Sequence, residues 1–294
     1  MTALLAGAAM AMVPSAAQAA PGTPVPLGDA AGFAVLAGAG ITNTGATTIA
    51  GDIGSFPTTS ISGLGTITLV GGVDRSGEAV TTQAKTDLVT AYDAASAQTP
   101  DPLGGVELAG LTLEPGVYDT GGVIELNGNL TLDANGDPNA VFVFQSLSTL
   151  LTGPAGSITF VDGATACNLY WRVPTSATIG TGSQFAGTIL AEASISFGAG
   201  ATLQGRALAQ SGAVTMITNT ITIPACATTP PTTPVVGPEG PQVAVAPRGS
   251  VATGDGSSLP ATSGQEPLLV AGTVLGLGLV AWTVGRLRRP RSSE

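Results

Sequence analysis

The sequence contains two cysteines and no histidine among its 294 residues, which limits the chemistry it can perform. Without histidine, neither the Ser/His/Asp nor the Cys/His catalytic arrangement can be built. Cys167 and Cys226 also match the spacing of no zinc motif. In a chain that we expect to be exported, this pair favours one structural disulfide, and two free thiols are the alternative.

Four carboxylates lie close together in the sequence and could serve as a paired acid and base: Glu107, Glu114, Asp119 and Glu125. A glycosidase of this kind needs two carboxylates across a substrate cleft, usually rich in aromatic side chains. The chain has few aromatics, with 2 Trp, 3 Tyr and 7 Phe. We therefore expect no enzymatic activity.

Residues 133–137 begin like a calcium-binding loop. Such a loop requires a glycine where Pro138 stands and a bidentate glutamate where Phe144 stands. The sequence therefore predicts a turn between strands at this point, with no metal site and no cofactor.

Near the C-terminus, a motif indicates chemistry performed on the chain rather than by it. Residues 259–264 have the sequence Leu-Pro-Ala-Thr-Ser-Gly, and an uncharged apolar run (267–285) and an arginine-rich tail (286–294) follow. The run is long enough to span a membrane as a helix, with the basic tail in the cytoplasm. This order resembles a sortase cell-wall sorting signal, which implies recognition of Leu259 and Pro260, attack on the Thr262 carbonyl and transfer to a cell-wall precursor. Ser263 replaces the usual glycine, so retention by the membrane helix is the alternative.

The N-terminal residues 1–19 are typical of a secretory signal peptide. An apolar run ends at Pro14, and the small-residue site Ala17-Gln18-Ala19 follows, although a basic start is missing. A disordered Ala-rich terminus is the alternative. Residues 228–258 are rich in proline and poor in apolar side chains, which predicts an extended spacer. We expect an extracellular protein, anchored in the cell wall or the membrane.

Between these end segments, residues 24–226 form one candidate domain. Their many Gly, Thr, Val and Ile residues favour short strands joined by tight turns. Residues 20–262 carry 17 acidic against 5 basic side chains. Such a negative surface repels phosphate backbones, so we do not expect nucleic-acid binding.

An internal repeat of 18 residues relates 185–191 to 203–209. Phe185, Leu203 and Ile221 share one column of this alignment, and a coil of a three-sided β-helix needs about this many residues. Chance similarity in a low-diversity sequence is the alternative. If these three side chains point inward, strand alternation places Thr202 and Thr220 outward, with Gln184 beside them. Two residues earlier, Gly182, Gly200 and Thr218 also point outward.

One stretch between the end segments, residues 78–97, has the pattern of an amphipathic helix. Ala84, Leu88, Tyr92 and Ala95 fall on one stripe, and Ser76 is its expected N-cap. We expect this helix to cover one side of the solenoid.

Several segments, in order from about Leu27 to Ile223, resemble the ice-binding-like family of discontinuous β-solenoid proteins. The segments that carry the resemblance are residues 33–38, 41–45, 51–54, 113–118, 137–145 and 166–171. The resemblance implies a mainly β fold: a right-handed, three-sided β-helix, or solenoid, with one long α-helix packed alongside. It also implies a flat face rich in Thr, Ser and Gly that binds ice.

The Thr-Gly-x-Thr pattern of some family members occurs here at residues 44–47. The candidate ice-binding residues are Thr44 and Thr47 from this pattern, and Thr202, Thr218 and Thr220 from strand alternation. We expect a cell-surface-anchored ice-binding protein, serving as an antifreeze or in adhesion to ice. The rival hypothesis is a surface adhesin or structural wall protein with the same fold and no ice activity, and the predicted anchor suits either.

Overall fold

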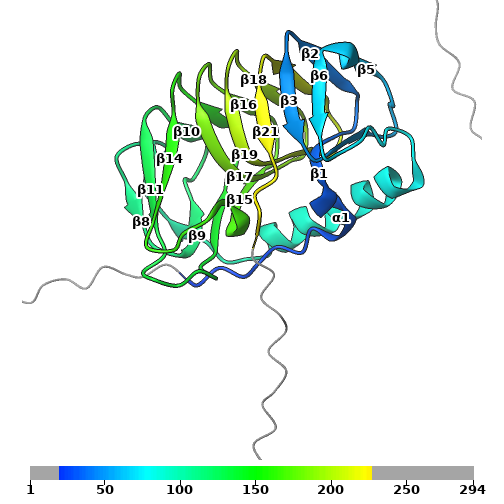
Figure 1. Cartoon of the computed structure of the whole chain (residues 1–294). Coiled ribbons are helices and arrows are strands. Elements are labelled where there is room, and N and C mark those ends of the chain that lie inside the picture. The colour runs from blue at the N-terminus through cyan, green and yellow to red at the C-terminus, as the bar shows by residue number, and fades with distance from the viewer. Residues whose placement is uncertain (1–19, 227–294) are drawn as a thin grey trace, which may run out of the picture. The chain divides into compact units, whose positions relative to one another are not determined.

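The computed structural model describes residues 20–226, which form a mainly β structure of parallel strands with one α-helix. Every pairing between strands is parallel, and the strands form two hydrogen-bonded sheets, which we describe as three rows: row A is one sheet, and rows B and C, which share two long strands, form the other. The repeated succession of one strand from each row along the chain is that of a β-solenoid (Figure 1).

Row A consists, in stacking order, of β10 (Ile124–Leu126), β13 (Leu150–Thr152), β16 (Ala177–Ile179), β18 (Ile195–Phe197), β20 (Val214–Ile217), β2 (Ile41–Thr44) and β5 (Ile61–Ser62). Row B consists of β8 (Thr112–Leu113), β11 (Asn129–Asp133), β14 (Ser157–Val161), the first halves of β17 (Gln184–Ala191) and β19 (Thr202–Ala209), then β21 (Thr220–Thr222), β3 (Thr47–Ala50) and β6 (Ile67–Val70). Row C consists of β7 (Asp101–Pro102), β9 (Gly116–Asp119), β12 (Phe142–Gln145), β15 (Leu169–Val173), the second halves of β17 and β19, β1 (Phe33–Ala37) and β4 (Asp52–Ser55). The described part of the chain also contains three short 3-10 helices: η1 (Gly28–Gly32), η2 (Leu64–Thr66) and η3 (Ala166–Asn168).

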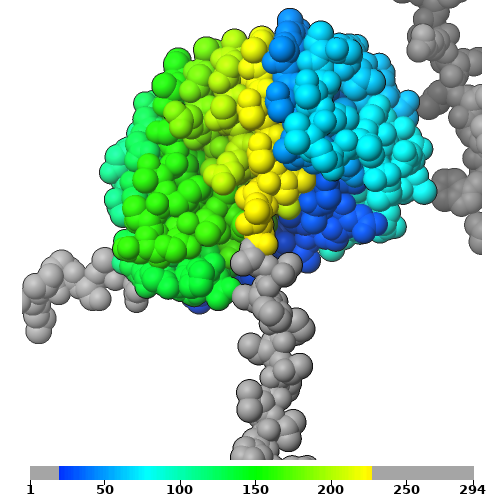
Figure 2. Space-filling view, in the orientation of Figure 1, coloured from blue at the N-terminus to red at the C-terminus, as the bar shows by residue number. Residues whose placement is uncertain are grey.

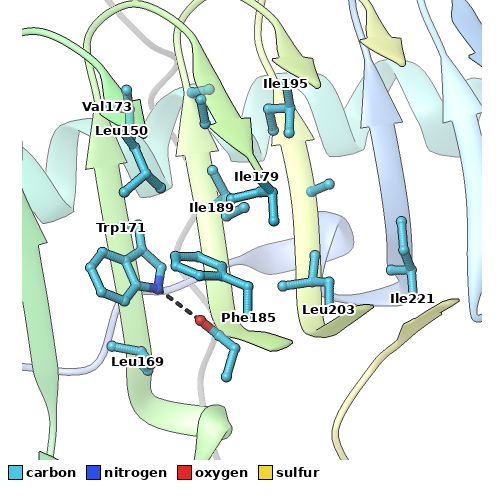
Figure 3. Close-up of a cluster of buried hydrophobic side chains, with 14 of the residues drawn as sticks. Leu150, Leu169, Trp171, Val173, Ile179, Phe185, Ile189, Ile195, Leu203 and Ile221 are labelled. Atoms are coloured by element: carbon cyan, nitrogen blue, oxygen red, sulfur yellow. Dashed lines mark hydrogen bonds between the residues drawn. The ribbon is translucent and has the colours of Figure 1, made fainter. Parts of the chain in front are cut away.

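The 18-residue repeat predicted from the sequence is confirmed by the strand register. Phe185 pairs with Leu203, which in turn pairs with Ile221 on the next strand. These three side chains lie side by side in the interior (Figure 3). Chance similarity is therefore excluded as the origin of this repeat.

The order of strands in the stack departs from their order in the chain. Strands β1, β2 and β3, near the N-terminus, pair with β19, β20 and β21, which belong to the last coil. In Figure 1 the yellow β21 accordingly lies beside the blue β3. The chain then passes through the helix to the opposite end of the stack and winds back toward its beginning.

The core of the solenoid contains a row of aromatic side chains in contact, of which two pairs are stacked and one is tilted. Ring centroids are 5.5 Å apart between Tyr118 and Phe144, 4.4 Å between Phe144 and Trp171, and 4.9 Å between Trp171 and Phe185. The Trp171 indole is fully buried, and its Nε1 donates to the Ala186 carbonyl at 2.8 Å, as the dashed line in Figure 3 marks. Aromatic stacking adds about 1 kcal/mol per pair to the gain from burial alone.

Helix α1 (Ala79–Ser96), the one α-helix within residues 20–226, covers row C. Its predicted stripe of Ala84, Leu88, Tyr92 and Ala95 is confirmed, because all four side chains are buried. The prediction of Ser76 as the N-cap is wrong: the backbone places Glu78 at that position, and no side chain caps the helix.

Polar contacts tie the helix to the strands beneath it. Lys85 Nζ donates to the carbonyl of Ala209 at 2.6 Å and to that of Gln210. Arg172 Nε donates to Ser96 Oγ at 2.8 Å, and its guanidinium lies 4.8 Å from the centre of the Tyr92 ring. The helix is therefore fixed in its N-terminal half and at its C-terminal end.

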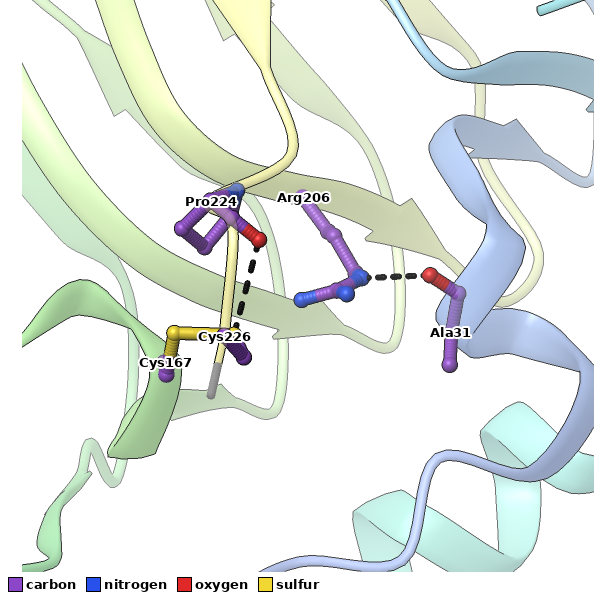
Figure 4. Close-up of a disulfide and its surroundings, with 5 residues drawn as sticks. All are labelled: Ala31, Cys167, Arg206, Pro224 and Cys226. Carbon is purple, nitrogen blue, oxygen red and sulfur yellow. Dashed lines mark hydrogen bonds between the residues drawn. A yellow bond between two sulfur atoms is a disulfide. The ribbon is translucent and has the colours of Figure 1, made fainter. Parts of the chain in front are cut away.

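The predicted disulfide between Cys167 and Cys226 is confirmed, with a Cα–Cα distance of 5.6 Å (Figure 4). It joins η3 to the segment that follows β21 and so ties the end of the last coil to the body of the solenoid. Nearby, Arg206 Nε donates to the Ala31 carbonyl at 2.8 Å and fixes η1 to β19.

The predicted turn at residues 133–137 is also confirmed. Asp133 ends β11, and Asn135 and Gly136 follow with φ values of 52° and 84°. Asp133 Oδ1 accepts a hydrogen bond from the Asn135 amide at 2.8 Å, so this carboxylate closes the turn.

Within residues 20–226, no helix is long and apolar enough to cross a membrane. The predicted signal peptide (1–19), spacer (228–258), sorting motif (259–264), membrane helix (267–285) and basic tail (286–294) lie outside the described residues.

Candidate functional site

The outer surface of row B carries two columns of small, uncharged side chains, which we call the row B surface. The first column contains Asn129, Ser157, Gln184, Thr202, Thr220, Thr48 and Thr68. The second contains Thr112, Thr131 and Thr159 toward one end and Gln204, Thr222, Ala50 and Val70 toward the other. Figure 2 shows this surface, with the last coil beside the N-terminal strands.

Four threonines occupy consecutive strands of the first column: Thr202, Thr220, Thr48 and Thr68. Neighbouring strands of a sheet lie about 4.8 Å apart, so these side chains repeat at that spacing. Each threonine is held on a backbone that is hydrogen-bonded to its neighbours, and its branched side chain has few rotamers. The column is therefore a regular and rigid array of methyl and hydroxyl groups.

The five threonines predicted as site residues lie in different places. Thr202 and Thr220 pair with each other on the row B surface. Thr44 is exposed at the end of β2 and belongs to row A. Thr218 is exposed in the turn between β20 and β21, where its φ is 52°.

Thr47 is the one candidate that points inward, and its interpretation as a surface residue is wrong. Its exposed fraction is 1%, its Oγ1 donates to Asn43 Oδ1 at 2.6 Å, and it accepts from the Asn219 amide at 3.1 Å. Asn219 Nδ2 in turn donates to the carbonyls of Gly198 and Ala201 at 2.8 and 3.0 Å. Thr47 therefore joins adjacent coils from within.

Sequence reasoning missed Thr48, Thr68 and Thr222, which are exposed on the row B surface. Thr48 and Thr68 lie on N-terminal strands that the 18-residue repeat does not reach. Alternation around Ile49, a buried residue, places Thr48 outward.

A hollow of about 380 Å³ interrupts the row B surface near its middle. Phe160 and Ile158 of β14 line one side, and Gln204 and Thr222 lie opposite. The hollow arises because β14 pairs with β17 only between Ser157 and Gln184, whereas β17 and β19 pair along eight positions.

Of the four carboxylates that lie close together in the sequence, Glu107 forms hydrogen bonds within the fold. Glu107 lies beside Glu125 in a parallel bridge, and its oxygens accept from the amides of Ala109 and Asn127 at 2.8 and 3.0 Å. Burial by itself raises the pKa of Glu107, but hydrogen bonds from Asn127, Ala109 and Leu108 outweigh burial and hold that pKa below its usual value. A general acid needs a raised pKa, so Glu107 does not fit that role, and its hydrogen bonds join it to Ala109 and Asn127.

Comparisons with known proteins agree with one another. A family model described as "Ice-binding-like" matches residues 35–222. An ice-binding protein of Nostoc sp. (strain HG1) is 45% identical over 206 residues, which cover 69% of this chain and 76% of that protein. The crystal structure of an ice binding protein from an Antarctic biological consortium has 45% identity and a TM-score of 0.67, covering 70% of this chain and 93% of that one. The ice-binding protein of the Antarctic ascomycete Antarctomyces psychrotrophicus has 40% identity and a TM-score of 0.66, covering 69% and 99%.

Proposed function

Because the chain belongs to the ice-binding-like family, a non-enzymatic family, we propose that it binds ice through the row B surface. The observation that carries this proposal is the column of four threonines on consecutive strands, Thr202, Thr220, Thr48 and Thr68.

The physical basis of the proposed contact is ordered water. Methyl groups at a regular spacing confine water between them, and hydroxyls at the same spacing hold that water by hydrogen bonds. If the pattern of held water fits the crystal lattice, the water merges with the growing ice. The contact needs an uncharged surface, because a charged side chain orders water around itself instead, and the two columns of the row B surface carry no charge.

Rigidity supports this mechanism, because a mobile surface would lose conformational entropy on meeting the crystal. The aromatic stack around Trp171, the internal contacts of Thr47 and Asn219, and the disulfide all hold the coils in register. The side chains that would meet ice are therefore organised before they meet it.

A substitution on the row B surface tests this proposal. In Thr220→Tyr a bulky ring projects above the row B surface. We expect the purified variant to be excluded from a growing ice hemisphere that incorporates the parent chain. The matched control is Thr42→Tyr, an exposed position in row A, which should behave like the parent. A parent chain excluded from ice would end the proposal, and adhesion to a protein or glycan partner would take its place.

We also propose the right-handed, three-sided form that the family resemblance implies. Three rows of parallel strands support three sides, and crossovers between parallel strands are right-handed in nearly all proteins. A crystal structure of this chain would test both features directly.

The location that we propose is the cell exterior, reached through residues 1–19 and kept through residues 259–294. The sorting motif, apolar run and arginine-rich tail stand in the order that a sortase and a cell-wall precursor require. The disulfide supports export, since such bonds persist in oxidising surroundings. If a sortase does not accept Ser263, the membrane helix predicted from the apolar run 267–285 would hold the protein at the membrane.

A further inference from the structure

Apart from Thr112, whose hydroxyl has no hydrogen-bond partner among residues 20–226, the outward hydroxyls of the row B surface fall into two groups by their hydrogen bonds. Toward the β11 end, the Asn129 side chain engages three of them. Ser157 Oγ and Thr159 Oγ1 donate to Asn129 Oδ1 at 3.1 and 2.8 Å, and Asn129 Nδ2 donates to Thr131 Oγ1 at 3.2 Å. We call this part the locked half.

At the other end of the row B surface, the hydroxyls have no such partner. Thr220, Thr222, Thr48 and Thr68 are exposed, and none of their hydroxyls hydrogen-bonds to another group among residues 20–226. Thr202, next in the column, has one long contact, from its Oγ1 to the Ser183 carbonyl at 3.4 Å. We call the part formed by β21, β3 and β6 the open half.

This difference decides how many hydrogen bonds each half can offer to water. A hydroxyl has one proton to donate. In the locked half the protons of Ser157 and Thr159 are already given to Asn129, and their rotamers are fixed by that amide rather than by the strand. In the open half every hydroxyl keeps its donor, and its orientation can follow a water lattice.

The hollow lies between β14 of the locked half and the strands β19 and β21, and Thr202, Thr220 and Thr222 line its border on the side of the open half. It lies where β14 diverges from β17. The surface of the locked half therefore does not continue in one plane with the surface of the strands beyond the hollow. A flat crystal plane resting on the open half would span the hollow before it reached Thr159. Geometry and hydrogen bonding thus favour the same end of the molecule.

We infer that ice contacts the open half, with Thr48, Thr68 and Thr220 as its central residues, and that the locked half contributes little. This inference rests on the proposed function and narrows it. The contact surface is then built from the two ends of the domain, since Thr48 and Thr220 come from strands far apart in sequence but paired in space.

Matched substitutions in the two halves test the inference in the full-length chain. Thr48→Tyr and Thr159→Tyr place the same ring at exposed positions of the same row. We expect Thr48→Tyr to weaken ice affinity by about tenfold or more, as for a central contact residue, and Thr159→Tyr to leave it nearly unchanged, as for a peripheral one. Ice affinity would be measured by fluorescence of labelled protein on a single crystal, and thermal hysteresis would be recorded beside it.

A second pair of variants controls for a loss of ice affinity that is caused by misfolding. Thr48→Val and Thr159→Val keep the shape of the side chain and replace its hydroxyl by a methyl group, and circular dichroism melting would verify each fold. Loss of affinity confined to the Thr48 variants supports the inference. Equal losses in both halves would overturn it and leave the proposed function standing. Ice binding that survives all four substitutions would overturn the inference and the choice of the row B surface together.

Discussion

Thr47 and Thr48 are neighbours in β3 with opposite environments, and replacing each by valine should separate stability from ice binding. Valine matches the shape of threonine but lacks its hydroxyl. In Thr47→Val, two buried groups lose their partner: Asn43 Oδ1, which accepts from Thr47 at 2.6 Å, and the Asn219 amide, which donates to it at 3.1 Å. A buried polar group left unsatisfied costs about 1–3 kcal/mol.

The expected loss of stability in Thr47→Val is therefore about 3 kcal/mol, after allowing for the easier burial of a methyl group than a hydroxyl. In a domain of this size, that loss lowers the melting temperature by roughly 6–12 °C. Thr48→Val should change stability by less than about 0.5 kcal/mol, because its side chain is exposed.

Differential scanning calorimetry gives both melting temperatures, and ice affinity is measured well below them. We expect Thr47→Val to bind ice like the parent and Thr48→Val to bind it less well. Equal melting temperatures for the two variants would refute the inward assignment of Thr47. Loss of ice binding in a folded Thr47→Val chain would refute its purely internal role.

Three further predictions concern the disulfide, the helix and the C-terminus. Cys226→Ser opens a loop of 59 residues and should lower the free energy of unfolding by about 4 kcal/mol in urea titrations, and an unchanged midpoint would contradict this. Burial lowers the pKa of Lys85 from 10.5 to about 8 in the folded chain, so between pH 8 and 10 the unfolded chain binds more protons and stability rises with pH. Because the ammonium is partly solvated and donates to two carbonyls, we expect a rise of only about 1 kcal/mol between pH 7 and 9.5, which Lys85→Met should abolish in the same titrations. Thr262→Ala should move the protein from the cell-wall to the membrane fraction, and unchanged fractionation would exclude a sortase.

The sequence was informative where structure repeats locally. The 18-residue spacing predicted the pairing of Phe185 with Leu203, and the apolar stripe predicted the buried face of α1. The 18-residue spacing and the apolar stripe both arise from residues that are close in the chain and are buried together. The absence of histidine, together with the expectation of export, likewise predicted the disulfide from composition.

The misassigned and missed threonines have a different origin. Alternation says that Thr47 and Thr48 face opposite ways, but only the neighbouring strands decide which of them is buried. Those neighbours include β21, whose Thr220 pairs with Thr48 across a long sequence separation that leaves no local pattern. Strand alternation, continued two residues back from Thr220, predicts that Thr218, Gly182 and Gly200 point outward from strands, yet all three have a positive φ and lie in turns.

The stacking of β3 on β21 has a consequence for how the protein is made. In an ordinary solenoid each coil rests on the one before it, so structure can spread along the chain as it emerges. Here β1, β2 and β3 leave the ribosome first, but the strands on which they rest, β19 to β21, leave it last. A nascent chain that stops short of Thr220 offers β3 no partner strand from the last coil. Contacts between such distant segments form slowly, so we expect completion of the domain to await its final strand.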